Sequence, residues 1–243
     1  MNGRHWLLFY GGVAGAWLVL YAMQLPSEML TAASLYGADF WQTLCAVQPG
    51  VAGAPGVFLM WAVMSAAMMA PTFLPTLATY DDLVRGGAAR GFAGLLGGYL
   101  VVWLGFSVLT TGAQIALSGA GLVNPVGQST SKWLTVALLA GAGGYQFSTL
   151  KAACLSKCRR PMAFFMQYWA DGPWRMGLRL GALCLGCCWA LMALGFVGGT
   201  MNLMWMGVAM ILMTLEKLPE IGRLTTRPLG FALLGAAGLA AIL

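Results

Sequence analysis

Residues 178–197 read LRLGALCLGCCWALMALGFV, an apolar run whose single charged residue, Arg179, lies at its start. A stretch of roughly 20 such residues is long enough to cross the hydrocarbon core of a bilayer as a helix. The run contains Cys184, Cys187 and Cys188, and positions three or four apart share one face of a helix. We therefore predict a membrane-spanning helix that carries three thiols on one stripe, shielded from bulk water.

Thiols in such a place suit a soft metal ion or thiol redox chemistry better than simple packing. A single buried cysteine usually behaves as a small hydrophobe. Here a second pair, Cys154 and Cys158, also has helical spacing, and it lies just before the run. The sequence favours chemistry at these residues and leaves the choice between metal binding and redox chemistry open.

The composition indicates the fold class. Apolar residues make up 60% of the 243-residue chain, charged residues only 8%, and the mean hydropathy is +0.78. A soluble domain carries about 25% charged residues. We predict an all-α, polytopic integral membrane helix bundle that forms a single domain over residues 1–243. The net charge of +6 indicates contact with anionic lipid headgroups rather than with nucleic acid.

Seven apolar stretches approach the length that a membrane span requires. The predicted spans lie near residues 6–24, 57–79, 92–119, 133–150, 178–197, 201–215 and 229–243. With these spans, only Lys132 among the Lys and Arg residues falls on the side opposite the N-terminus. The positive-inside rule then places the N-terminus in the cytoplasm and the C-terminus outside.

Two connections between the predicted spans are long. Residues 25–56 lie outside and contain Cys45, to which we assign no role. Residues 151–177 lie inside and turn apolar between 162 and 169. That apolar part is too short to span a bilayer, so we predict an interfacial or re-entrant segment. Among small-residue pairs, Gly11 with Gly15 and Gly94 with Gly98 have the spacing that lets helices approach closely.

The methionines and the single histidine limit which metal ion the chain could bind. Met64 and Met68 are one turn apart, and Met192 follows Cys188 by four residues. Thiolate and thioether ligands select Cu(I), whereas a histidine-built copper or iron centre cannot be assembled around the single His5. A carboxylate at the lip of a span is a possible proton or cation contact. The candidate metal ligands are Cys154, Cys158, Cys184, Cys187, Cys188, Met64, Met68, Met192 and Glu216.

Several sequence blocks resemble a bacterial family described as predicted metal-binding integral membrane proteins. They are MWAVMSAAMMAP at 60–71, GYQFSTLKAACLSKCRRP at 144–161, CLGCCWALM at 184–192, and MNLMW at 201–205 with Glu216-Lys217. The resemblance covers about residues 57–230. Some members are linked to copper delivery to tyrosinase-like oxidases. The resemblance implies a multi-pass protein of the bacterial inner membrane that binds Cu(I) and has a membrane or periplasmic oxidase as partner.

Three functions remain in competition. The leading hypothesis is a membrane protein that handles or delivers Cu(I) through Cys and Met ligands, without catalysis of its own. The second is an accessory or structural subunit of a membrane-bound, metal-dependent oxidase complex, whose partner brings the histidines. The third is a thiol–disulfide oxidoreductase, since Cys184 and Cys187 have redox spacing. This last reading lacks a second cysteine pair outside, where only Cys45 occurs. The sequence offers no triad, phosphate loop or paired carboxylates for hydrolysis or nucleotide chemistry.

Overall fold

A computed structural model of the chain describes residues 4–23, 53–84 and 89–243. Within these ranges every regular element is a helix, and the single strand-like feature is an isolated bridge between Val123 and Ser129. The all-α class is therefore confirmed. The helices are α1 (Arg4–Ala22), α4 (Ala54–Leu83), α5 (Ala89–Gly119), α6 (Lys132–Tyr145), α7 (Thr149–Cys158), α8 (Pro161–Tyr168), the short 3-10 helix η2 (Trp169–Asp171), α9 (Gly172–Ala193), α10 (Gly195–Gly198), α11 (Leu203–Lys217) and α12 (Gly222–Ile242).

Five helical stretches in the described part of the chain are long and apolar enough to cross a membrane. They are Arg4–Ala22, Ala54–Leu83, Gly91–Gly119, Pro161–Gly198 and Leu224–Ile242. The predicted spans at 133–150 and 201–215 correspond to α6 and α11, which have 14 and 15 residues. At a rise of 1.5 Å per residue these helices are about 21–23 Å long, shorter than the core of about 30 Å. A multi-pass membrane protein is supported, and the count of seven spans remains a prediction.

The predicted span at 133–150 is not one continuous helix. Helix α6 ends at Tyr145, and α7 begins at Thr149. Ser148 is the N-cap at which α7 begins. Its backbone is extended, and its side-chain oxygen accepts a hydrogen bond from the Leu150 amide at 3.1 Å. Cys154 and Cys158 therefore lie one turn apart on a short separate helix.

The apolar segment after this helix folds back into the bundle. Pro161 takes the first position of α8, where its missing N–H costs no hydrogen bond. Phe164 and Phe165 are buried, and the Phe165 ring lies 5.5 Å from the Tyr80 ring of α4. The short apolar segment is thus helical and does not span by itself, as its length predicts.

The closest packing in the bundle joins α5 to α9. A Cβ atom added at Gly98 would collide with the carbonyl oxygen of Trp174, and one at Gly177 with that of Leu95. The two backbones therefore touch, as the predicted role of Gly94 and Gly98 requires. At Gly11 and Gly15 an added Cβ atom would have no described neighbour within 4 Å, so the same role for this pair stays a prediction.

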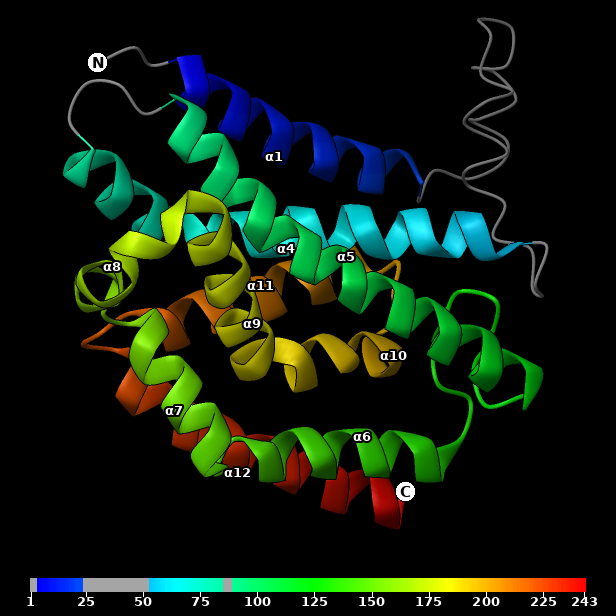
Figure 1. The fold of residues 1–243 in the computed structure, drawn as a ribbon. Helices are drawn as coiled ribbons and strands as arrows, with labels where there is room; N and C mark the ends of the chain where they lie inside the picture. Colours follow the sequence, from blue (N-terminus) through cyan, green and yellow to red (C-terminus); the bar gives the residue numbers. More distant parts are fainter. Residues whose placement is uncertain (1–3, 24–52, 85–88) are drawn as a thin grey trace, which may run out of the picture.

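Figure 1 shows α9 near the middle of the bundle, with α4 and α5 on one side and α6, α7 and α12 on the other. In sequence-distant contacts, α9 packs against α5, α6, α7 and α11, while α12 packs along α6. Helix α1 lies at the edge against α4. Its start and the end of α12 lie at opposite ends of the bundle (Figure 1).

This arrangement predicts that the two termini face opposite sides of the membrane. Alkaline phosphatase fused after Leu243 should be active, whereas the same enzyme fused before residue 4 should be inactive, because it folds only outside the cytoplasm. Green fluorescent protein at the same positions gives the reciprocal control. Matching activity at both ends would contradict an odd number of spans.

Candidate metal centre

Cys184, Cys187 and Cys188 form one buried cluster on α9. Their sulfur atoms all lie within 4.8 Å of one another, and the group is the one potential metal site of three or more His, Cys, Asp or Glu side chains within the described ranges. The Cys187 and Cys188 sulfurs are 3.3 Å apart, well beyond the bond length of about 2.05 Å in a disulfide. A metal–thiolate bond of about 2.3 Å puts opposed sulfurs about 4.6 Å apart. The three free thiols therefore fit around one ion.

The second cysteine pair lies directly against this cluster. Gly186 leaves room for the Cys154 sulfur, which would be 2.7 Å from a Cβ atom at that position. Cys158 lines one cavity together with Cys184. In addition, the Tyr145 hydroxyl donates to the carbonyl oxygen of Gly186 and holds the end of α6 against α9. The structure thus brings the two predicted cysteine groups together, although they come from different helices.

Lys217 is a component of the centre that the sequence reading missed. Its ammonium nitrogen lies 3.0 Å from the Cys184 sulfur and also donates to the hydroxyl of Thr72. The Tyr99 hydroxyl lies 3.0 Å from the same sulfur and 3.1 Å from the carbonyl oxygen of Met69. Helices α4, α5, α9 and α11 therefore converge on one thiol. From the sequence, Lys217 contributes to the positive-inside pattern and to a family motif. Its four-carbon stem also lets the ammonium group extend back along the helix to the cluster.

Glu216 has a different environment from the one we expected. We placed it at the lip of a span, where a charge is easily solvated, but it is only 1% exposed. Its Oε2 atom lies 2.7 Å from the ammonium of Lys151, which is equally buried. Lys151 is therefore paired inside the protein and is not an exposed loop charge. Glu216 is not a member of the cysteine cluster, and its role as a cation contact remains a prediction.

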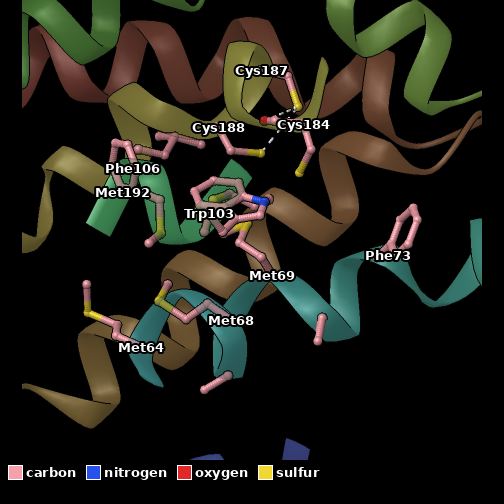
Figure 2. Close-up of a cluster of buried hydrophobic side chains, with 14 of the residues drawn as sticks. Met64, Met68, Met69, Phe73, Trp103, Phe106, Cys184, Cys187, Cys188 and Met192 are labelled. Atoms are coloured by element: carbon pink, nitrogen blue, oxygen red, sulfur yellow. Dashed lines mark hydrogen bonds between the residues drawn. The ribbon is translucent and has the colours of Figure 1, made fainter. Parts of the chain in front are cut away.

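The predicted thioether ligands lie in the same hydrophobic core as the cluster. Met64, Met68 and Met192 are all nearly inaccessible to solvent. Figure 2 shows the three cysteine side chains grouped on α9, with these methionines and Met69 elsewhere in that core. Their placement permits the predicted role, and it is equally what apolar packing produces.

A cavity of about 190 Å³ leads to Cys184. It is lined by Tyr99 and Cys184 at its buried end and by Arg159 and Pro219 near the surface, with Cys158 and Lys217 along its wall. The surface end lies between the corner that joins α7 to α8 and the turn that joins α11 to α12. The cavity connects one end of the bundle with the cysteine cluster.

A family model described as a copper chaperone, PpoB2, matches residues 58–240. The chain belongs to this copper chaperone family. No curated protein and no solved structure matches the chain. The resemblance inferred from the motifs is confirmed, and the matched range contains every cysteine of the centre but not Cys45.

The donor set agrees with the copper cargo that the family name implies. Thiols select Cu(I) over harder cations, and a site with three thiols and no imidazole has this character. The single histidine lies elsewhere, because the His5 Nε2 atom is 3.3 Å from a carboxylate oxygen of Asp81. Cys45 lies outside the described residues, so the prediction that no second cysteine accompanies it on the outer side stays a prediction.

We predict that Glu216→Gln destabilises the protein by about 3–5 kcal/mol, because it leaves the Lys151 ammonium buried without its counter-charge. The copper affinity of the cysteine cluster should be unchanged. Thermal unfolding in detergent and competition with a Cu(I) chelator measure the two effects separately. Glu220→Gln, at the exposed neighbouring carboxylate, is the matched control. A weaker copper affinity without a loss of stability would instead make Glu216 a copper contact.

Proposed function

We propose that the protein is a membrane copper chaperone that binds Cu(I) at Cys184, Cys187 and Cys188 and transfers it to a partner protein. The observation that carries the proposal is the cluster of three reduced thiols within 4.8 Å, buried on α9 of a chain that belongs to a copper chaperone family. Because all three ligands come from one helix, no rearrangement between helices is needed to assemble them.

The surroundings of the cluster favour Cu(I) over other metals. Zn²⁺ also accepts thiolates, but its structural sites use four ligands, usually on short loops. Here three thiols lie within a helix, and the ammonium of Lys217 lies 3.0 Å from the sulfur of Cys184. A Cu(I) ion with two thiolates carries one negative charge, which a single ammonium neutralises.

The cysteine pair on α7 and the buried methionines suggest a route for the ion. Cys154 and Cys158 would receive copper at the cytoplasmic end and pass it to the cluster on α9, because Cys158 and Cys184 line one cavity. Met192, Met68 and Met64 would form weaker binding steps toward the outer face, ending near Met60. Thioethers hold Cu(I) less tightly than thiolates, so no step would trap the ion.

The proposed setting is the bacterial inner membrane, with the N-terminus in the cytoplasm. Helix α6 together with α7, and helix α11, would add two crossings to the five long stretches. The partner would be a membrane or periplasmic oxidase that supplies histidines, because the described chain places its one histidine in contact with Asp81. The same observation supports the second candidate, a permanent subunit of an oxidase complex. Stoichiometric co-purification with the oxidase would favour that candidate.

The central test is the copper content of the full chain, purified in detergent under reducing conditions. We expect one Cu(I) per wild-type chain and none in the double variant Cys184→Ser, Cys187→Ser, measured by elemental analysis after exposure to a Cu(I) chelator. Cys45→Ser is the control that removes one thiol outside the range matched by the family model. The proposal is wrong if wild type binds no copper or if the double variant keeps it.

The methionine route gives a separate prediction. Replacing Met64 and Met192 by leucine preserves volume and should cost less than about 1.5 kcal/mol of stability per site. We expect copper content to persist while transfer to an external chelator slows by about 10-fold, in the range seen when a supporting group at a metal site is lost. Met166→Leu with Met204→Leu, at exposed positions, is the control. Equal transfer rates would assign the buried methionines to packing alone.

A further inference from the structure

We propose that copper reaches Cys184 as an anionic Cu(I)–thiolate complex of a low-molecular-weight thiol, and that Lys217 recognises its charge. This inference rests on the proposed function and adds the chemical class of the copper donor. Three observations carry it: the size of the cavity at Cys184, the charges on its wall, and the charge balance of ligand exchange.

The cavity is too large for a bare ion and too small for a protein domain. Its volume of about 190 Å³ is several times the roughly 30 Å³ that one water molecule occupies. It is also smaller than the 300–1,000 Å³ that is typical of pockets for drug-sized ligands. The copper–sulfur end of a small thiol complex fits this range, with the remainder of the thiol at the surface near Arg159.

The wall of the cavity is cationic where it carries charge. Its lining includes Lys217 and Arg159, and none of the described residues that line it is acidic. The carboxylate closest in sequence, that of Glu216, pairs instead with Lys151, while the backbone oxygen of Glu216 accepts a hydrogen bond from Arg159. A free cuprous cation that approached Cys184 would meet like charge within a few ångströms. An anionic complex would be attracted to the same position.

The remaining wall suits the organic part of such a donor. Phe73, Leu180 and Pro161 supply apolar surface, and the Phe73 ring stacks on Tyr99 at 4.0 Å between ring centroids. Figure 2 shows Phe73 on α4 and Cys184 on α9. An apolar wall excludes water, which strengthens the attraction between the Lys217 ammonium and an anion.

The exchange reaction keeps its charge and needs no redox partner. In the first step, the bond from copper to one donor sulfur breaks and a bond from copper to the Cys184 sulfur forms. The displaced donor sulfur leaves in the protonation state that the Cys184 sulfur had before the exchange. A second exchange with Cys188 or Cys187 releases the other thiol in the same way. Copper stays Cu(I), and the complex keeps one negative charge beside Lys217 throughout.

The test compares two copper donors on the full chain in detergent micelles. The Cu(I)–glutathione complex is anionic, and tetrakis(acetonitrile)copper(I) is cationic. Loading is followed by stopped-flow absorbance of the copper–thiolate bonds for wild type, Lys217→Gln and Lys217→Arg. We expect Lys217→Gln to slow loading from the anionic donor by about 10-fold, within the range of electrostatic effects on association. Loading from the cationic donor should be unchanged or faster, and Lys217→Arg should behave as wild type.

Ionic strength provides the second measurement. Loading of wild type from the anionic donor should slow as salt is added, and loading of Lys217→Gln should respond much less. Equal slowing of both donors in Lys217→Gln, or no slowing of either, would overturn the inference. Failure of the proposed function looks different, because wild type would then take up no copper from either donor.

Discussion

The backbone contact between α5 and α9 is the constraint on which the centre depends. Gly98 and Gly177 let the two helices touch, and helix packing in lipid relies on such close approach rather than on burial of apolar surface from water. Tyr99 follows Gly98 directly, so the same contact presses its hydroxyl against the sulfur of Cys184. A bulkier residue at either glycine would separate the helices and remove one wall of the cavity. The glycines therefore position the reactive sulfur without contacting it.

The charged side chains next to the cluster also depend on their partners. In an apolar surrounding, an ionic group must be paired, and Lys151 and Lys217 meet this requirement differently. Lys151 is buried against the carboxylate of Glu216, so the two charges cancel. Lys217 is half-buried, and among the described residues it donates to the Thr72 hydroxyl and to the Cys184 sulfur. Its charge is thus available to an anion that forms at the cluster, and the adjacent pair keeps the neighbouring carboxylate from cancelling it.

The spacing of the cysteines allowed much of the centre to be predicted from the sequence. Helical periodicity is local, so Cys184, Cys187 and Cys188 were placed on one face correctly, and the hydropathy predicted the helical class. Lys217 was missed because its contact with Cys184 depends on how α11 packs against α9, which periodicity does not encode. The break before Thr149 depends on a single serine cap within an apolar run, a signal that average hydropathy hides. Glu216 was misplaced for a related reason, since its partner Lys151 is 65 residues away.

In the proposed function, the division of thiols between two helices separates holding copper from receiving it. The cluster on α9 is assembled by helix geometry alone, so it exists whenever that helix is folded. Cys158 belongs to α7, which is joined to α6 by a turn at 146–148, and its position beside the cavity at Cys184 depends on how α7 packs against α9. Gly186 sets that docking distance, because the Cys154 sulfur occupies the space that any other side chain would need. The glycine within the CLGCC motif is therefore required for the close approach of Cys154 to α9, on which the proposed transfer between the two cysteine groups depends.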